Sequence, residues 1–592
     1  MKVRTHTCGQ LRKEDIGNIV SLNGWISKSR DLGGVTFIDL RDRYGKTQIV
    51  FNEDISLDAF EIAKSLGLED VIGITGKVVQ RPNGAINKDI LTGEIDVEVD
   101  DIIVYNESET PPFDINDRQS ASEDHRLKFR YLELRTKELQ ENMILRHNAA
   151  ISTRNFLSSR EFIEVETPIL MKSTPEGARD FLVPSRIHKG SFYALPQSPQ
   201  TYKQLLMVSG LDKYFQIVKC FRDEDFRADR QPEFTQIDIE MSFVQQDDIV
   251  DIGTGLVKYL WSEILDVNLP DKFPVYSYHD AMSRFGSDKP DTRFGMELQE
   301  FSEYVKSSDF NAFKSVIESG GIVKAIVCPN SNNYSRKVID ELTDYLKEYF
   351  NAKGLAWMKC VNGKLEGGIS KFFKEDIQQN IISHLGVNDD EIIFIVGDKA
   401  KIVFNALGAL RLKLADRESL IDKNGWSPLW VVDFPLVEWN EDLDRWDALH
   451  HPFTAPNPED LNKLDESPGD VRSLGYDIVM NGYELGGGSI RIHNKDMQKK
   501  IFKLLGISDE EAEEKFGFLM DAFKYGAPPH GGMAFGFDRI VMLMAYCNQI
   551  RDVIAFPKTT SAMSLMDKSP SKVDSEQLKE LSLKIINNDS DS

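Results

Sequence analysis

Cysteine is scarce in this sequence, and no cysteine spacing suits a metal ion. The 592 residues contain five cysteines, an odd number scattered without a Cys-x-x-Cys pair, and ten histidines without a His-Glu-x-x-His helix. These absences argue against a disulfide scaffold, a structural zinc site and a protease-type metal centre.

Long hydrophobic runs are also missing. Residues 540–546 form one of the longest runs, far shorter than the roughly 20 apolar residues that cross a bilayer, and no apolar segment follows Met1-Lys2-Val3. The composition, 41% hydrophobic and 28% charged, is typical of a globular protein. We therefore expect a cytoplasmic protein with no membrane contact, and at about 150 residues per domain the length predicts three or four domains.

Positive charge is in deficit as well. The formal net charge is −24, which argues against a nucleic-acid partner because phosphate binding normally requires lysine and arginine. The distribution is uneven: residues 1–50 hold nine Lys and Arg against five Asp and Glu, whereas residues 51–107 hold four against thirteen. The N-terminal excess is compatible with a basic patch, although such runs are most often solvated faces.

The first 107 residues are predicted to form a small β-barrel. Short runs of strand-forming residues are separated by turn signals such as Gly33-Gly34 and Pro82-Asn83-Gly84. These runs are residues 19–26, 35–39, 47–51 and 71–79. An OB-fold, a common platform for single-stranded nucleic acid, fits this pattern, and an SH3-like barrel without any role in RNA binding fits it equally well.

The rest of the chain is predicted to hold a hinge, a second core and an insertion. Pro111-Pro112 and a charged run are typical of a hinge, after which a helical pattern over 136–159 and a strand ended by Pro168 open the second core. Alternating helix and strand patterns near 322–327 and 392–396 lie in a segment without chemistry-bearing motifs. The predicted domains are 1–107 (barrel), 108–134 (hinge), 135–294 and 416–592 (two parts of the second core, the latter with a C-terminal extension) and 295–415 (inserted α+β domain).

Residues 214–241 are predicted to form an antiparallel hairpin with one polar face. Gln236, Asp238 and Glu240 alternate with apolar residues and therefore share a face. The connecting loop carries a dense set of charges, namely Arg222, Glu224, Arg227 and Arg230. Arginine grips phosphate through two parallel hydrogen bonds, which suits a phosphate site; a surface hairpin with ordinary salt bridges fits the same residues equally.

Residues 483–492 are strand-like but contain three successive glycines, Gly486-Gly487-Gly488. Glycines weaken a strand unless another group approaches the backbone closely. Strict alternation places Glu484 and Arg491 on opposite faces, so a bulge near the glycines is required if both serve one site. Asp477 adds a second carboxylate, and two carboxylates beside a bound triphosphate suit Mg²⁺.

Residues 531–539 form a glycine-rich strand that enters a helix. Taken alone, a glycine-rich turn is weak evidence for any function. No Gly-x-x-x-x-Gly-Lys-Ser/Thr sequence occurs in the chain, which excludes a P-loop as an ATP site.

Three segments, taken in their order along the chain, resemble the three motifs of class II aminoacyl-tRNA synthetases. The helix and strand up to Pro168 resemble the first motif, Phe221-Arg222-Asp223-Glu224 the second and Gly536-Phe537-Asp538-Arg539 the third. The His-Ile-Gly-His and Lys-Met-Ser-Lys-Ser signatures of class I synthetases are absent. Joint occurrence in this order is far more specific than any single motif.

Further stretches resemble the bacterial-type aspartyl-tRNA synthetases. They are Thr174 to Asp180, Ser198 to Lys203, Arg230 to Asp238 and Ala448 to Phe453. The resemblance covers nearly the whole chain and implies a multidomain α+β fold: an N-terminal OB-fold anticodon-binding barrel, a hinge, an antiparallel-sheet class II catalytic domain in two parts, and the inserted α+β domain of the bacterial form.

The resemblance implies a ligase that charges tRNA with aspartate in protein synthesis. The aspartate carboxylate attacks the α-phosphorus of ATP to give aspartyl-adenylate, and the 3′-terminal ribose hydroxyl of tRNA(Asp) then attacks this anhydride. No protein nucleophile is needed, so catalysis rests on positioning and charge stabilisation. The catalytic residues implied are Arg222, Glu224 and Arg539.

The same resemblance implies the binding residues. Those for aspartate are Glu176, Gln200, Lys203, Arg222, Asp238, His450 and Arg491, with His450 on a mobile loop that closes over the amino acid. Those for ATP are Arg222, Asp223, Glu224, Gln231, Phe234, Glu484, Gly536, Phe537, Asp538 and Arg539. Asp477 and Glu484 would carry the cofactor Mg²⁺.

Lys203 and Arg491 offer a physical account of specificity. If they are two buried cations that await the side-chain carboxylate of the substrate, asparagine would leave their charge poorly neutralised. An unpaired buried charge costs on the order of several kcal/mol, enough for strong rejection without editing.

The resemblance also implies macromolecular partners. Phe37 and Gln48 match positions that the family uses on the anticodon, although from sequence alone a core aromatic is the better interpretation of Phe37. Forms that also charge tRNA(Asn) tend to carry histidine at the position of Leu32, so leucine favours tRNA(Asp) alone, with tRNA(Asn) as an alternative second substrate. The motif around Pro168 implies a homodimer.

Two rival interpretations remain. An asparaginyl- or lysyl-tRNA synthetase shares the barrel and the class II core, but the inserted domain and the Lys203 and Arg491 pair discriminate against it. A catalytically silent RNA-binding or regulatory relative is disfavoured because the sequence retains Arg222, Glu224, Glu484 and Arg539.

Overall fold

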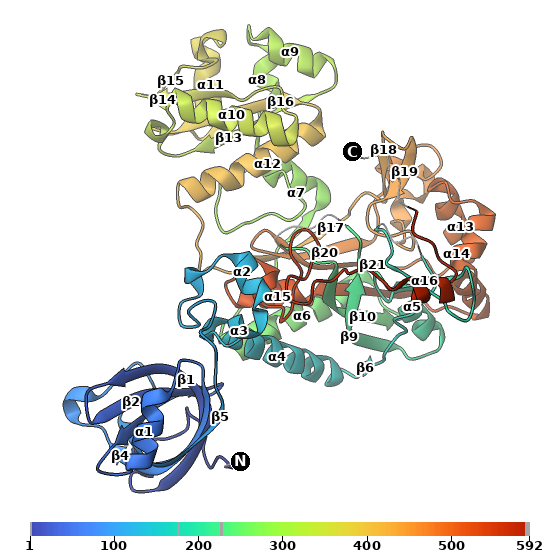
Figure 1. Cartoon of the computed structure of the whole chain (residues 1–592). Helices are drawn as coiled ribbons and strands as arrows, with labels where there is room; N and C mark the ends of the chain where they lie inside the picture. Colours follow the sequence, from blue (N-terminus) through green and yellow to red (C-terminus); the bar gives the residue numbers. More distant parts are fainter. Residues whose placement is uncertain (1–2, 175–177, 225–228, 587–592) are drawn as a thin grey trace. The chain divides into compact units, whose positions relative to one another are not determined.

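The computed structural model describes residues 3–174, 178–224 and 229–586 (Figure 1). The chain divides into two compact units. The first comprises residues 1–147, 226–231 and 547–572, and the second comprises residues 148–225, 232–546 and 573–592. None of the helices described is both long and apolar enough to span a bilayer.

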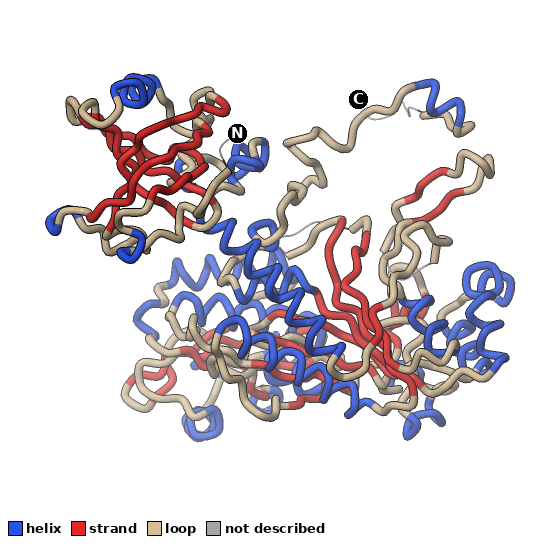
Figure 2. The backbone as a smooth tube through the Cα atoms, turned by 90° about the horizontal axis from the view of Figure 1, so that it is seen from below, coloured by secondary structure: helices blue, strands red, loops and turns tan. Residues whose placement is uncertain are grey.

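The N-terminal residues form the predicted closed barrel, with strands in the order β1-β2-β3-β5-β4. Only β3 and β5 pair in parallel. The elements are β1 (Ile19–Asp31), β2 (Val35–Asp42), β3 (Gly45–Asn52), α1 (Leu57–Ser65), β4 (Val71–Gln80) and β5 (Ile95–Asn106). The strands of the barrel are red in Figure 2. Alternate residues such as Leu22, Ile38 and Ile74 belong to its buried core, which is the period of two seen in the sequence.

Helices α2 (Glu123–Lys128), α3 (Arg130–Glu133) and α4 (Lys137–Ser158) follow the barrel. Just before α4, Arg135 Nη1 lies 2.8 Å from Glu69 Oε2, and Arg41 Nη2 of β2 lies 2.8 Å from the same oxygen. The Arg135 guanidinium also lies over the Trp25 ring at 5.2 Å. One buried carboxylate therefore fastens the start of α4 to the barrel.

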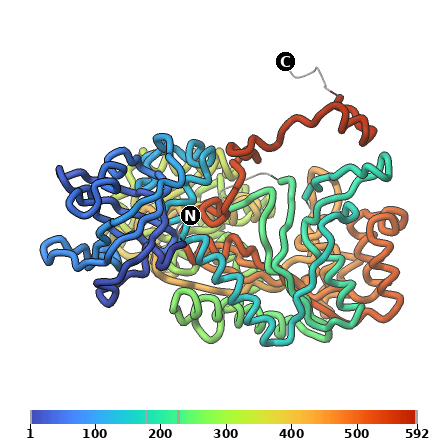
Figure 3. The backbone as a smooth tube through the Cα atoms, turned by 60° about the horizontal axis from the view of Figure 1, so that its bottom comes forward, coloured from blue at the N-terminus to red at the C-terminus, as the bar shows by residue number. Residues whose placement is uncertain are grey.

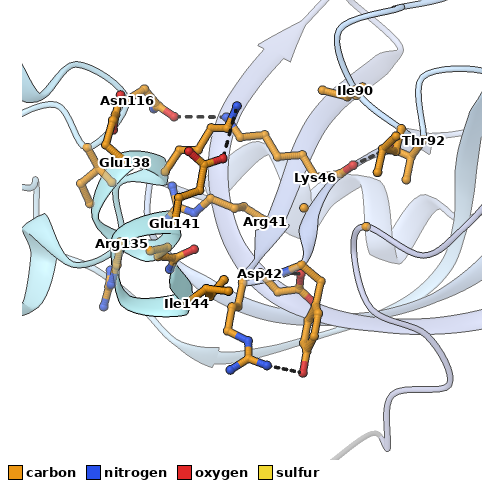
Figure 4. A pocket seen from close by; sticks show the side chains of 18 of the residues that line it. Arg41, Asp42, Lys46, Ile90, Thr92, Asn116, Arg135, Glu138, Glu141 and Ile144 are labelled. Atoms are coloured by element: carbon orange, nitrogen blue, oxygen red, sulfur yellow. Dashed lines mark hydrogen bonds and ion pairs between the residues drawn. The ribbon is translucent and has the colours of Figure 1, made fainter. Parts of the chain in front are cut away.

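A cavity of about 560 Å³ lies beside this contact, between the barrel and the start of α4 (Figure 4). Its wall includes Arg41, Asp42 and Lys46. Asp42 accepts the backbone N–H of Cys8 at 2.9 Å, and Lys46 donates to Asn116 at 3.3 Å. These charged groups of the wall are thus engaged with the protein itself.

An eight-stranded sheet forms the centre of the second unit, in the order β11-β17-β20-β21-β22-β10-β9-β6. Its neighbours are antiparallel except for the two edge pairs, β11 with β17 and β6 with β9. The strands are β6 (Ile163–Glu164), β9 (Lys213–Phe221), β10 (Glu233–Ser242), β11 (Val275–Ser277), β17 (Pro428–Val432), β20 (Gly475–Met480), β21 (Tyr483–Ile490) and β22 (His530–Gly536). Edge strand β6 is shorter than predicted, because only its two residues pair with β9.

Segments far apart in the sequence meet in this sheet. Figure 3 shows the chain around residue 240 in green beside the chain around residue 530 in red, which is the pairing of β10 with β22. The remaining elements outside the insertion are β7 (Leu182–Pro184), β8 (Phe192–Ala194), α5 (Gln200–Val208), α6 (Gln246–Leu265), α7 (Tyr278–Phe285), β18 (Val437–Asn440), β19 (Arg445–Ala448), α13 (Lys495–Leu504), α14 (Asp509–Ala522), α15 (Phe537–Met544) and α16 (Ser575–Glu580).

The segment after α7 forms the inserted α+β fold, with a five-stranded sheet in the order β12-β13-β16-β14-β15. Its elements are β12 (Gln299–Glu300), α8 (Ser302–Lys306), α9 (Asn311–Glu318), β13 (Ile322–Cys328), α10 (Arg336–Phe350), β14 (Ala356–Val361), β15 (Lys364–Glu366), α11 (Glu375–Leu385), β16 (Ile392–Asp398) and α12 (Ala400–Arg417). Ile393 and Phe394 of β16 belong to two different apolar clusters, so both faces of the sheet are covered.

A buried arginine secures the connection that leads into the insertion. Arg411 of α12 is 1% exposed and donates to the carbonyl oxygens of Asp291, Phe294, Gly295 and Met296 at 2.7–3.1 Å. Burial lowers the pKa of its guanidinium to about 10. The connecting segment is therefore held by one side chain through four backbone oxygens.

Replacing Arg411 by methionine is expected to lower the free energy of unfolding by about 3 kcal/mol, because buried carbonyl groups lose their donor. Denaturant unfolding followed by circular dichroism measures the change. The control is Arg417→Met on the same helix, because this arginine donates to the Asn333 carbonyl at an exposed position. This control should lower the free energy of unfolding by less than about 1 kcal/mol. Equal losses for the two variants would contradict the assignment.

Candidate active site

The β9–β10 hairpin places three polar side chains in the interior of the second unit. Gln236, Asp238 and Glu240 alternate along β10 as predicted, but Asp238 and Glu240 are 0% exposed. Strand β10 lies between β9 and β22, and α5 packs on it. Buried carboxylates require partners, so this polar face is part of a site and not an ordinary hairpin surface.

Two cations meet these carboxylates. Lys203 Nζ of α5 lies 2.6 Å from Asp238 Oδ1 and 3.3 Å from Glu240 Oε2, and Arg491 Nε lies 3.1 Å from Glu240 Oε1. Arg491 Nη1 also donates to Ser489 Oγ at 2.8 Å. The structure therefore brings Lys203 and Arg491 together, but in a cluster of four charges and not as two cations without partners.

Burial and neighbouring charges act against each other in this four-charge cluster. Burial raises the pKa of Asp238 to about 6 in spite of the Lys203 ammonium. Burial acts in the same direction on Glu240, but Arg491 and then Lys203 outweigh it and hold the pKa of Glu240 below its usual value. Glu240 thus loses its proton more readily than an ordinary glutamate, whereas Asp238 loses its proton less readily than an ordinary aspartate.

The loop after β9 carries the second motif. The Arg222 N–H donates to the Pro232 carbonyl at 2.9 Å, which closes the base of the loop, and its guanidinium lies over the Phe234 ring at 5.1 Å. Asp223 pairs with Arg179 through its backbone N–H at 3.1 Å. The Arg222 guanidinium and the Phe234 ring therefore lie together on the hairpin. Glu224 is the last loop residue that the structure describes before residue 229.

Strand β21 contains the bulge that the sequence required. Ile478 pairs with Gly486 and Val479 pairs with Glu484, so Leu485 is the extra residue. A Cβ on Gly487 would lie 2.2 Å from Asp477 Oδ1, and one on Gly488 would lie 2.1 Å from the Gly532 carbonyl oxygen. The groups that approach these glycines are therefore a carboxylate and the neighbouring strand of the same protein.

Asp477 and Glu484 stand on the adjacent strands β20 and β21. Burial is the main influence that raises the pKa of Asp477 to about 6, and the Glu484 charge raises it further. Two carboxylates that repel each other fit a divalent cation between them. Carboxylate oxygens are ligands that Mg²⁺ prefers, so the donor chemistry of this pair fits that ion. In the described part of the chain, no three His, Cys, Asp or Glu residues form a group that could hold a metal ion.

The third motif joins β22 to α15. Gly536 ends the strand and Phe537 begins the helix. Asp538 Oδ2 accepts the backbone N–H of Thr235 at 2.7 Å, and Arg539 Nη1 donates to the carbonyl oxygen of Glu484. The third motif therefore contacts the second motif through Asp538 and the glycine-rich strand through Arg539.

Two adjacent histidines complete the site. His450 Nε2 lies 3.1 Å from Asp477 Oδ1, and this pairing outweighs burial and raises the pKa of His450. Burial, helped by Arg491, lowers the pKa of His451 to about 3. His451 Nδ1 accepts the N–H of Phe453, so its proton sits on Nε2, which finds no acceptor among the described residues.

The structure does not place four of the predicted site residues in this cluster. Glu176 lies outside the described residues. Gln231 belongs to the first unit, where it exchanges two hydrogen bonds of 3.0 and 2.8 Å with the backbone of Lys558. In the barrel, Gln48 Nε2 donates to Asp96 at 3.0 Å, and half-buried Phe37 is not part of the barrel core.

Sequence reasoning missed Glu240 and His451 as site residues. Glu240 was visible only as one member of an alternating polar face, and its pairing with Arg491 joins positions 251 residues apart. The adjacent pair His450-His451 was a usable signal, since both side chains are half-buried and, besides burial, the Arg491 charge acts to lower the pKa of each.

Comparison with known proteins identifies the class. A model of class II tRNA synthetases (D, K and N) matches residues 122–560, and a model of OB-fold nucleic acid binding domains matches residues 20–105. An asparaginyl-tRNA synthetase from Pyrococcus horikoshii, solved with asparaginyl-adenylate, has the same fold, with a TM-score of 0.58, 18% identity and coverage of 94% of this chain and 99% of that chain. The chain belongs to the class II tRNA synthetases.

Within that class, the relatives are specific. An aspartate–tRNA ligase from Staphylococcus carnosus is 53% identical over 99% of this chain and 100% of its own length. An aspartate–tRNA(Asp/Asn) ligase from Caldanaerobacter subterraneus is 51% identical over 98% of each chain. The chain is a member of the bacterial aspartate–tRNA ligase family, which confirms the predicted family over its asparaginyl and lysyl relatives.

Proposed function

We propose that this protein activates L-aspartate with ATP and transfers it to the 3′ end of tRNA(Asp). The observation that carries the proposal is the four-charge cluster of Lys203, Asp238, Glu240 and Arg491, two of whose members lie on the same β9–β10 hairpin whose loop carries Arg222. It offers cations for the side-chain carboxylate of aspartate and a carboxylate, Asp238, for its ammonium group.

Activation requires the aspartate carboxylate to approach the α-phosphorus against charge repulsion. Arg222 contacts both groups, and the planar guanidinium can hydrogen-bond to each of them at once. Phe234 stacks on adenine, while Arg539 holds the terminal phosphates. Charge stabilisation and alignment then supply the rate enhancement without a protein nucleophile.

The remaining residues of the ATP site frame the nucleotide. Asp223, Glu224 and Gln231 line it from the second-motif loop. At Gly536 and Phe537 the backbone of the third motif comes close to the nucleotide. Asp538 positions the second motif through Thr235. Asp477 and Glu484 would hold Mg²⁺, which would neutralise phosphate charge when bound.

The substrate aspartate is enclosed on several sides. Glu176, Gln200 and Asp238 surround the ammonium group, and Lys203 and Arg491 bind the side-chain carboxylate. His450 closes the site from its own loop. Because Glu240 already neutralises part of the cationic charge, discrimination against asparagine rests on donor geometry as well as on net charge.

The barrel reads the anticodon through Phe37, whose half-buried ring stacks on an unpaired base, and through Gln48, which hydrogen-bonds to a base edge. Leu32 is 75% exposed, and leucine there favours tRNA(Asp) as the sole substrate, with tRNA(Asn) the alternative. The protein works in the cytoplasm as a homodimer; exposed Ile163 and Leu170 near edge strand β6 support that interface.

Exchange of labelled pyrophosphate into ATP with each amino acid in turn tests this function. We expect exchange with aspartate only, and only in the presence of a divalent cation. Exchange that depends on asparagine or lysine, or no exchange with any amino acid, would contradict the proposal.

The KM for aspartate should depend on pH through Asp238, whose pKa is raised to about 6. A raised carboxyl pKa means that the ionised form, which binds the ammonium, is lost as the pH falls through about 6. Lys203, Glu240, Arg491 and Tyr214 are the titratable groups around it. We expect the KM for aspartate to rise several-fold between pH 7.5 and about 5.5 while the KM for ATP changes less, as measured by pyrophosphate exchange.

A further inference from the structure

A chain of hydrogen bonds links three buried side chains at one end of α5. Gln200 Nε2 donates to Gln204 Oε1 at 3.2 Å, and Gln204 Nε2 lies 3.0 Å from His530 Nε2. His530 Nδ1 lies 2.8 Å from the Pro528 carbonyl oxygen. Gln204 and His530 are 0% exposed and Gln200 is 6% exposed. Only Gln200 belongs to the substrate site described above.

The carbonyl oxygen of Pro528 fixes which group donates and which accepts in every hydrogen bond of this series. A carbonyl oxygen only accepts, so His530 Nδ1 carries the proton towards Pro528. A neutral imidazole then offers Nε2 as an acceptor, and Gln204 must donate its amide N–H to it. The amide oxygen of Gln204 therefore faces Gln200, which must donate in turn.

The surroundings keep His530 neutral. Burial is the largest influence and lowers the pKa of His530; Arg491 and His493 act in the same direction, and Glu240 opposes them. A protonated ring would donate from both nitrogens and would force the amide of Gln204 to turn over. The amide of Gln200 would then turn over as well.

We propose that Gln204 and His530 are positioning residues that orient the side-chain amide of Gln200, so that its oxygen faces the ammonium group of bound aspartate. The inference rests on the proposed function, which puts Gln200 at that ammonium. An ammonium group only donates hydrogen bonds, so a reversed Gln200 amide would point its own N–H donors at the ammonium and could not accept from it. Because the two ends of an amide have almost the same shape, packing alone does not select one orientation.

Two substitutions of Gln204 separate this role from a packing role. Gln204→Met keeps the length of the side chain but removes the acceptor for Gln200. Gln204→Glu keeps that acceptor, although it buries a charge and is the more severe change for packing. We expect Gln204→Met to raise the KM for aspartate about tenfold in pyrophosphate exchange, the effect of one hydrogen bond to a charged group, and Gln204→Glu to remain closer to the wild type.

Succinate, which is aspartate without its amino group, shows whether the effect acts through the ammonium. The inhibition constant of succinate should be the same for wild type and Gln204→Met, so that the preference for aspartate over succinate falls about tenfold. Gln378→Met in the insertion, where the glutamine donates to the carbonyls of Ser370 and Phe373, is the control and should leave both constants unchanged.

The outcomes distinguish the two proposals. A larger KM for aspartate in Gln204→Glu than in Gln204→Met, or an equal loss of succinate affinity in Gln204→Met, would overturn the positioning role and leave the proposed function standing. Absence of aspartate-dependent exchange in the wild type would overturn both.

Discussion

Replacing Arg491 by leucine lowers kcat/KM for aspartate by about a thousandfold, because the substitution removes a substrate cation and leaves buried Glu240 with Lys203 in place of two cationic partners, a loss of roughly 3–5 kcal/mol. Arg491 Nε and Nη2 contact the two Glu240 oxygens at 3.1 and 3.3 Å, and both side chains are at most 4% exposed. Binding of ATP should be nearly unchanged, since the site assigned to adenine and phosphates does not include Arg491.

Pyrophosphate exchange measures the first effect, and calorimetric titration with ATP measures the second. The matched control is Arg284→Leu, which breaks a two-point Arg–Glu contact with Glu297 at the surface and should leave exchange unaltered. An Arg491→Leu protein that is folded and shows unchanged aspartate-dependent exchange would remove the basis for the specificity argument.

The second large effect is expected at Arg222. Leucine in its place should reduce kcat for aspartyl-adenylate formation by about 10²–10³, the typical loss when one group that stabilises transition-state charge is removed. Arg222→Lys retains the charge but not the fork of donors, so it should recover only part of the rate. Stopped-flow measurement of adenylate formation compares the three proteins directly.

Full recovery by Arg222→Lys would show that only net charge matters at this position. Equal KM changes for aspartate and ATP, with no change in kcat, would show that Arg222 binds substrates without acting on the transition state. Either result would contradict the role assigned to the second motif.

Local patterns predicted the parts of the site that depend on sequence spacing. The odd spacing of Glu484 and Arg491 required a bulge, and Leu485 provides it. The alternation along β10 placed Asp238 and Glu240 on one face. The four main runs of the barrel became β1 to β4, because a period of two is a local property of the chain.

Contacts between distant residues could not be predicted in the same way. Glu240 is separated from Arg491 by 251 positions and Gln204 from His530 by 326, so only the folded sheet brings them together. For this reason the sequence suggested two cations without partners, whereas the structure contains a balanced four-charge cluster. The edge strand β6 was predicted, but its short length was not, since that length depends on its pairing with β9.

Aminoacylation of purified tRNA(Asp) with labelled aspartate or asparagine tests the central claim most directly, with tRNA(Asn) as the parallel substrate. The four-charge cluster predicts that aspartate alone is attached to tRNA(Asp), and Leu32 of the barrel predicts little or no product on tRNA(Asn). Attachment of asparagine, or failure to attach aspartate to tRNA(Asp), would contradict the account.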